Sequence, residues 1–182
     1  MSGERPYPDE PASPFPEPPV SFSDREDRRI EVQGYDPGDA VPEPLVAMYD
    51  AYDPADRAQG IPPSGERRVR AWLAGLFEEG FNVVAWHDDE AVAHATLVAE
   101  GDPDDPGDGH YELAIFVFQP YQGAGVGQRL LRTLLGFGAS RGVERVWLTV
   151  ERWNRAAVGL YEDVGFEVVD AGTFEHEMAL RL

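Results

Sequence analysis

The stretch YELAIFVFQPYQGAGVGQRLLRTLL, residues 111–135, decides the fold of this chain. Residues 113–118 are all apolar, which predicts a strand that is covered on both faces. Pro120 ends this strand, and glycines follow at alternate positions, Gly123, Gly125 and Gly127. Apolar residues then recur at helical spacing over residues 126–135. The sequence therefore predicts a strand, a glycine turn and a helix in direct succession.

A strand that runs through glycines into a helix can hold an anion. The first N–H groups of a helix have no partner within it, and the helix dipole attracts negative charge. Glycine lets a phosphate approach the backbone and permits positive φ. The dinucleotide motif G-x-G-x-x-G fails at Gln128, and the P-loop needs a lysine, which this chain lacks. The pattern Q-x-x-G-x-G, formed by Gln122, Gly125 and Gly127, does fit.

A second motif follows the next predicted strand. Residues 144–150 (ERVWLTV) alternate as a strand does, and residues 154–166 read NRAAVGLYEDVGF. Together the two motifs resemble the GNAT superfamily of N-acetyltransferases. Its pyrophosphate loop has Arg or Gln before x-x-G-x and then Gly or Ala. It carries N-x-x-A-x-x-L-Y-x-x-x-G-F at the second place, where every specified position matches. The resemblance covers residues 30–182 and implies transfer of an acetyl group from acetyl-CoA.

The composition excludes several classes of protein. The chain has 182 residues, of which 42% are hydrophobic, enough for one domain with a core. It has no cysteine, so disulfides, a thiol nucleophile and cysteine-ligated metals are excluded, and we expect no metal site. No apolar run approaches the roughly 20 residues of a membrane span, and the N-terminus is too polar for a signal peptide. We therefore expect a cytoplasmic protein that does not bind membranes.

The chain is strongly acidic, with a formal net charge of −19, and all 15 basic residues are arginine. This charge argues against a nucleic-acid partner, because phosphates need a basic surface. Two explanations of the acidity remain. The surface either attracts cationic acceptors such as polyamines and lysine-rich tails, or it is a solvated surface of the kind that suits a high-salt, halophile-like cytoplasm. The acidic residues are spread along the whole chain, which favours the second explanation.

The pattern of elements divides the chain into two parts. Residues 1–28 carry seven prolines among acidic residues and are expected to form a disordered arm. Residues 29–182 are expected to form the GNAT domain. Strands are predicted at 29–35, 81–86, 91–98, 110–118, 144–150, 166–169 and 173–182, and helices at 42–52, 66–79, 125–141 and 154–164. The resemblance implies an α+β, three-layer fold with a mixed, mostly antiparallel sheet, whose two middle strands splay apart at the cofactor. The acidic loop at 100–109 lacks the order of a calcium loop and is interpreted as a solvated hairpin loop.

The resemblance implies that acetyl-CoA is held largely by backbone groups. The pyrophosphate is expected on the N–H groups of Gln122, Gly123, Ala124, Gly125, Val126 and Gly127. The pantetheine arm is expected to pair, as a strand would, with the edge at Phe116, Val117 and Phe118. Asn154 is expected to contact CoA, and it also fits a helix N-cap.

One position departs from the family pattern. Many relatives carry a lysine or arginine at the position of Ala124, beside the phosphates. The absence of this basic side chain is expected to weaken CoA binding unless another cation replaces it. Arg129 and Arg132 are candidates, with solvation of the helix surface as the alternative role for both.

Acetyl transfer to an amine needs a polarised carbonyl, an acid and a base. The N–H of Val117 or Phe118 is expected to polarise the thioester carbonyl. Tyr161 matches the family tyrosine near the CoA sulfur and is expected to protonate the thiolate. Glu112 is expected to be the base, because lost solvation among apolar neighbours raises the pKa of a carboxyl. His110, His94 and a water chain remain alternatives.

The acceptor is not encoded by any motif. The motifs lie nearest to bacterial-type protein lysine acetyltransferase domains. Ribosomal N-terminal acetyltransferases carry a glutamate where this chain has Thr149, which counts against that subfamily. A small amine, a protein lysine and a protein N-terminus all remain, as do monomer and homodimer. Tyr49, Tyr52 and Trp72 either face the acceptor or pack in the core. The alternative function is a catalytically silent GNAT module that binds CoA or a partner.

Overall fold

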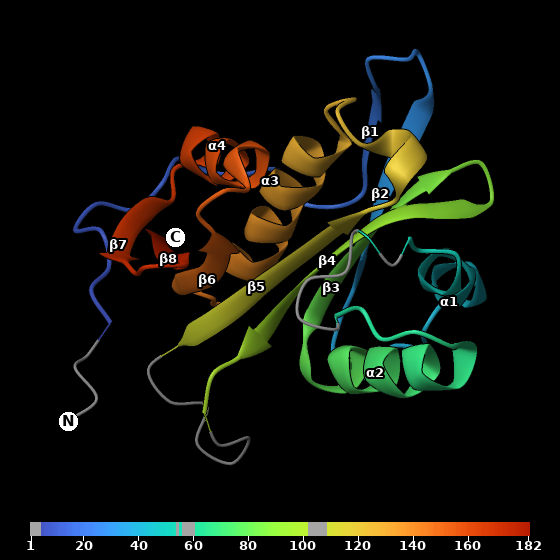
Figure 1. The fold of residues 1–182 in the computed structure, drawn as a ribbon, viewed down its shortest axis with the longest axis horizontal. Helices are drawn as coiled ribbons and strands as arrows, with labels where there is room; N and C mark the ends of the chain where they lie inside the picture. Colours follow the sequence, from blue (N-terminus) through green and yellow to red (C-terminus); the bar gives the residue numbers. More distant parts are fainter. Residues whose placement is uncertain (1–4, 54, 56–60, 102–108) are drawn as a thin grey trace.

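The structure, a computed structural model, describes residues 5–53, 55, 61–101 and 109–182. It has one sheet of eight strands in the order β1-β2-β3-β4-β5-β6-β8-β7 (Figure 1). The strands are β1 (Val20–Ser23), β2 (Arg29–Tyr35), β3 (Phe81–His87), β4 (Glu90–Ala99), β5 (His110–Val117), β6 (Arg145–Glu151), β7 (Glu167–Ala171) and β8 (Glu175–Arg181). The helices are α1 (Glu43–Asp50), α2 (Glu66–Glu79), α3 (Val126–Ala139) and α4 (Arg155–Val164).

The sheet is covered by helices on both faces. In Figure 1, α3 and α4 lie on one side of the sheet and α1 and α2 on the other. Residues 113–117 of β5 are all apolar because both faces of this strand pack against a core. Leu113, Ile115 and Val117 pack into the core under α3, whereas Phe116 packs against the core under α1 and α2. The expected α+β fold with helices on both sides of a mixed sheet is confirmed.

Each helix and strand predicted for residues 29–182 is present, with ends that shift by a few residues. The glycine turn leads into α3 at Val126, as its pattern predicts. The acidic loop predicted at 100–109 lies mostly outside the described residues. No helix in the described part of the chain is both long enough and apolar enough to cross a membrane.

The expected splay between the two middle strands is also present. β4 pairs with β5 in an antiparallel ladder from Ala93 opposite Val117 to Ala99 opposite Tyr111. On its other side, β5 pairs with β6 in parallel at residues 110–112 alone. Beyond Glu112 the two strands diverge, and one edge of residues 113–117 has no β6 partner (Figure 1).

The N-terminal segment differs from the expected disordered arm. Residues 20–23 form β1, which pairs antiparallel with β2. Upstream of β1 the arm runs across α3, where a Cβ on Gly136 would lie 2.0 Å from the carbonyl oxygen of Pro16. It continues to the end of β8, where the Ala12 N–H donates to the Arg181 carbonyl at 2.7 Å. The prolines of the arm led us to expect disorder. Phe15 and Phe22 nevertheless pack against the core, so the arm buries apolar surface that favours an ordered conformation.

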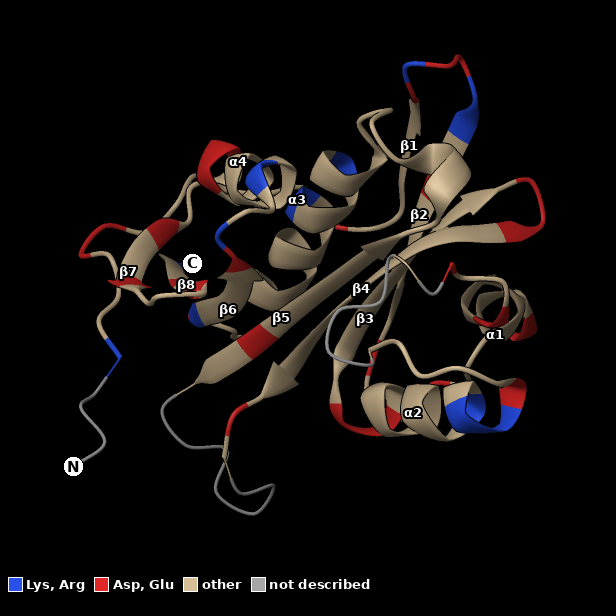
Figure 2. Cartoon of the chain, in the orientation of Figure 1, with Lys and Arg blue, Asp and Glu red and all other residues tan. Residues whose placement is uncertain are grey.

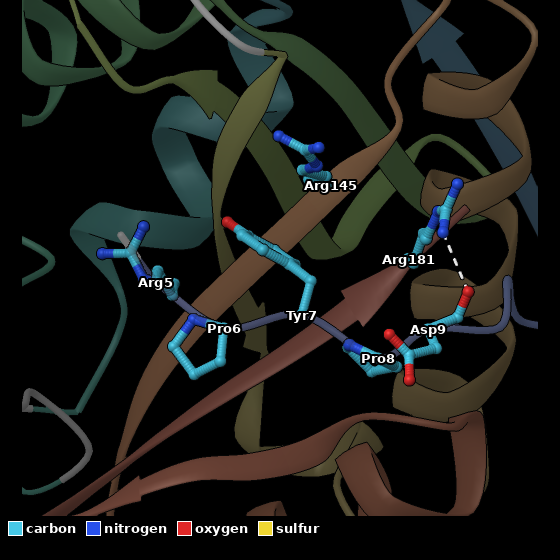
Figure 3. Close-up of a pocket in the computed structure, with 7 residues that line it drawn as sticks. All are labelled: Arg5, Pro6, Tyr7, Pro8, Asp9, Arg145 and Arg181. Carbon is cyan, nitrogen blue, oxygen red and sulfur yellow. Dashed lines mark hydrogen bonds between the residues drawn. The ribbon is translucent and has the colours of Figure 1, made fainter. Parts of the chain in front are cut away.

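The arm ends over the open face of β6 and β8. Its residues 5–9, with Arg145 and Arg181 of those two strands, line a cavity of about 380 Å³ (Figure 3). Tyr7 and His110 join the arm to β5, since the Tyr7 hydroxyl and His110 Nδ1 lie 3.0 Å apart. Arg181 Nη1 donates to the Asp9 carbonyl at 2.8 Å, the contact that is dashed in Figure 3. The cavity therefore lies at the paired end of β5, away from the glycine turn.

Candidate active site

The glycine turn presents a row of backbone donors at the start of α3. Gly123 and Gly125 have φ of 71° and 87°, in the left-handed region that favours glycine. Within the described residues, the N–H groups of residues 123–127 donate to no carbonyl or side chain. The Gln122 N–H differs from the expectation, because it already donates to the Gln119 carbonyl at 3.1 Å. Five of the six expected donors therefore remain for an anion.

Gly127 lies where three elements meet. A Cβ placed on it would be 3.5 Å from Val117 Cγ2 of β5 and 3.7 Å from Leu160 Cδ2 of α4. These are ordinary contact distances, so an alanine would also fit there, as the family pattern allows. The contact brings the glycine turn, the open edge of β5 and α4 to one place.

The edge of β5 that faces the gap can be assigned from its ladder. The Phe118 N–H donates to the Val92 carbonyl at 2.9 Å, so it belongs to the sheet. The expectation that it polarises a thioester is therefore wrong. In an antiparallel ladder the direction of the N–H alternates along the strand. The Val117 N–H consequently points towards the gap, and the backbone groups of Phe116 point towards β4.

The Val117 carbonyl on this edge is already occupied. It accepts from the Tyr52 hydroxyl at 3.1 Å and from Gln122 Nε2 at 3.0 Å. Tyr52 follows α1 and is buried, and Gln122 belongs to the glycine turn. Tyr52 therefore lies at the gap, which the sequence left undecided, and the glycine turn is fixed to β5 by a side chain.

α4 contributes the two residues that the second motif pointed to. Asn154 caps the helix, since its Oδ1 accepts from the Ala157 N–H at 3.2 Å. Tyr161 is 8% exposed and packs edge-on against Phe166. Burial raises the pKa of Tyr161 to about 12, so the phenol keeps its proton at neutral pH. No side chain of the described part hydrogen-bonds to its hydroxyl.

Glu112 lies at the other end of β5, where the pairing with β6 stops. Glu112 is exposed as a whole residue, yet its carboxyl loses part of its solvation, which raises its pKa. The nearby Glu100 raises this pKa further, and Arg5 lowers it. Arg5 of the arm lies over the ring of Trp147, which is opposite Glu112 in β6. A strand rises about 3.3 Å per residue, which places Glu112 about 16 Å from Val117 along β5. This separation excludes direct proton transfer between the carboxyl and an amine at Val117.

The two histidines that were alternative bases both have other partners. His94 is fully buried, which lowers its pKa to about 3 and keeps it neutral. Its Nε2 donates to Asn82 Oδ1 at 2.8 Å, because that amide nitrogen donates to two carbonyls, and its Nδ1 accepts from the Tyr49 hydroxyl at 2.7 Å. His110 lies between Tyr7 and Arg145. Tyr49 and His94 are therefore core residues.

The sequence did not reveal that the β1–β2 turn lies against the glycine turn. The Arg25 N–H donates to the Ala124 carbonyl at 3.0 Å, and Arg25 Nη1 donates to the Gly123 carbonyl at 3.2 Å. Arg129 and Arg132, the cations that the sequence offered instead, lie over the arm residues Phe22 and Phe15. The only signal in the sequence was the pair of aspartates in SDREDR, residues 23–28, because aspartate favours tight turns.

The chain is similar in sequence to known proteins. A family model described as "Acetyltransferase (GNAT) family" matches residues 45–166. An uncharacterised N-acetyltransferase of Mycobacterium bovis is 31% identical over 93 residues, which are 50% of this chain and 56% of that protein. The N-alpha-acetyltransferase RimI of Mycobacterium tuberculosis is 50% identical over 60 residues, 32% of this chain and 36% of that protein. The matches thus span little more than half, or about a third, of these relatives.

A solved structure supports the fold over most of the chain. The GNAT domain of S. lividans PAT superimposes with a TM-score of 0.72 and covers 90% of this chain and 96% of that one. Its sequence identity to this chain is 20%, so the likeness concerns the fold alone.

Proposed function

Because the chain belongs to the GNAT acetyltransferase family, we propose that it transfers an acetyl group from acetyl-CoA to a primary amine. The observation that carries this proposal is the open edge of β5 beside five unused N–H donors at the start of α3. Such donors fit a pyrophosphate, and an open strand edge fits the amides of a pantetheine arm. The Asn154 side chain lies at the start of α4 and is proposed to contact the same cofactor.

The Val117 N–H is proposed to polarise the thioester carbonyl. It points into the gap, and the peptide after it is fixed at both ends, by Tyr52 and Gln122 at the Val117 carbonyl and by Val92 at the Phe118 N–H, which restrains the backbone of residue 117. A donor that is fixed before the reaction stabilises developing negative charge without reorganising. Removal of one such donor typically lowers turnover by about 10² to 10³.

Tyr161 and Glu112 are proposed to move the two protons. The Tyr161 hydroxyl stays protonated at neutral pH and protonates the leaving thiolate of CoA. Glu112 accepts the proton of the amine through a chain of waters, because it lies about 16 Å along β5 from Val117. The net reaction is amine plus acetyl-CoA to amide plus CoASH, with no other reactant.

The acceptor is proposed to be an amine of a small molecule or of a protein lysine or N-terminus. The similarity to RimI favours a protein N-terminus, whereas Thr149 at the position of its family glutamate disfavours it. A release assay for CoASH against polyamines, amino acids, lysine peptides and N-terminal peptides tests the proposal. CoASH release above hydrolysis with any acceptor supports it. Failure of acetyl-CoA to bind in calorimetry, at low and high salt, contradicts it.

A further inference from the structure

Position 124 cannot carry the phosphate-binding cation in this chain. Ala124 is only 4% exposed, and the Arg25 N–H of the β1–β2 turn donates to its carbonyl at 3.0 Å. A long side chain at this position would have to displace that turn. The lysine or arginine that many relatives carry there would therefore not fit without such a shift.

The β1–β2 turn is built around Asp24. This carboxylate is 6% exposed, and it accepts from the N–H groups of Glu26 at 2.9 Å and Arg28 at 3.0 Å. It also accepts from Arg28 Nε at 2.7 Å. Burial alone would raise the pKa of Asp24, but the hydrogen bonds from Arg28 and Glu26 outweigh it and lower the pKa. The turn therefore keeps one shape against the glycine turn.

The two arginines of this turn have different surroundings. Arg28 has several partners: it pairs with Asp24, donates to the Pro120 carbonyl at 2.9 Å and lies over the ring of Tyr121. Arg25 is exposed and forms no ion pair with any carboxylate of the described part. Its Nη1 donates to the Gly123 carbonyl, and its Nε lies 3.9 Å from where a Cβ of Gly125 would be.

We infer that Arg25 supplies the cation that binds a phosphate of CoA, in place of the missing side chain at position 124. This inference rests on the proposed function. Arg25 lies beside both left-handed glycines whose N–H groups are unused. The chain carries a net charge of −19, so a polyanionic cofactor is repelled unless positive charge is concentrated where it binds. Figure 2 shows blue segments on both sides of the β1–β2 turn, with acidic residues between them.

The test measures Kd by calorimetry for CoA and for 3′-dephospho-CoA, with the parent and with Arg25→Gln. The matched control is Arg67→Gln, which removes the same charge from the exposed start of α2. Because Arg25 would donate charge-assisted hydrogen bonds to a phosphate, Arg25→Gln is expected to weaken CoA binding about tenfold. The Kd of Arg67→Gln for CoA is expected to stay within twofold of the parent value. Arg25→Lys, which keeps the charge, is expected to recover part of the affinity.

The two ligands distinguish the phosphates. An equal loss with CoA and 3′-dephospho-CoA assigns Arg25 to the pyrophosphate, and a loss confined to CoA assigns it to the 3′-phosphate. Both results support the inference. Affinity of Arg25→Gln equal to that of Arg67→Gln overturns it and leaves the proposed function intact. If the parent binds neither ligand, the proposed function fails and this inference fails with it. Circular dichroism and melting of each variant verify that the turn has not unfolded.

Discussion

The two halves of β5 belong to one strand but have different neighbours. Residues 110–112 pair with both β4 and β6, and the arm covers their end with Arg5 and Tyr7. Residues 113–117 pair with β4 alone and face the glycine turn and α4. The Val117 N–H, which is proposed to polarise the thioester, and the Tyr52 hydroxyl both lie at the open half. The difference teaches that the departure of β6, rather than a cluster of unusual side chains, creates the open edge on which the proposed reactive centre depends.

The largest effect is expected from Val117→Pro, which removes the proposed oxyanion donor at the open half. The Val117 N–H does not belong to the β4 ladder, so proline is tolerated there much as it is on an edge strand. We expect kcat/KM to fall by about 10² to 10³. Val117→Ala is the matched control, because it keeps the N–H and loses only methyl groups. Activity of Val117→Pro within threefold of Val117→Ala, in a folded protein, would remove this donor from the mechanism.

Tyr161→Phe tests the proposed proton donor on α4. The hydroxyl has no side-chain partner in the described part of the chain, so its removal leaves no buried group unpaired. We expect kcat to fall about 100-fold, at the lower end of the range for general acid catalysis, with Kd for CoA within twofold of the parent. Rapid-mixing and steady-state assays measure both values. A kcat within threefold of the parent would mean that the thiolate leaves without help from Tyr161.

His94 lies on β4 opposite Phe116 of β5 and tests whether water is excluded from the core at the paired edge. Its folded pKa of about 3 lies below the value of about 6.5 in an unfolded chain. The unfolded state therefore binds a proton first as the pH falls, and stability present above pH 6.5 is lost towards pH 3. Between pH 7.5 and 5.0 this loss amounts to about 2 kcal/mol in the free energy of unfolding. Urea titrations of the parent and of His94→Gln measure it, and equal pH slopes in both proteins would contradict the assignment.

The sequence could predict those features that are encoded by residues near one another in the chain. The glycine turn, the cap at Asn154 and the apolar strand β5 are local patterns, and each appears where the pattern predicts it. The choice between Val117 and Phe118 could not be made, because it depends on which strand each N–H faces. Arg25 was missed for a related reason: it lies about a hundred residues before the turn that it contacts. The arm was misjudged because its prolines were weighed without the aromatic residues between them.

The smallest effect is expected at the closed half, where Glu112 and Arg5 lie. Glu112→Gln is expected to lower kcat/KM about tenfold and to remove a limb from its pH profile, because the base acts through water. Arg5 lowers the pKa of Glu112, so Arg5→Ala should raise it further and move the acid limb of the profile to higher pH. The limb moves to higher pH because the base acts only when it is deprotonated, and a carboxyl with a higher pKa loses its proton at a higher pH. Arg67→Ala is the control for charge, and an unmoved limb in Arg5→Ala would assign the limb to a group other than Glu112. The closed half of β5 would then have no part in proton transfer, and the base would have to be sought beside Val117.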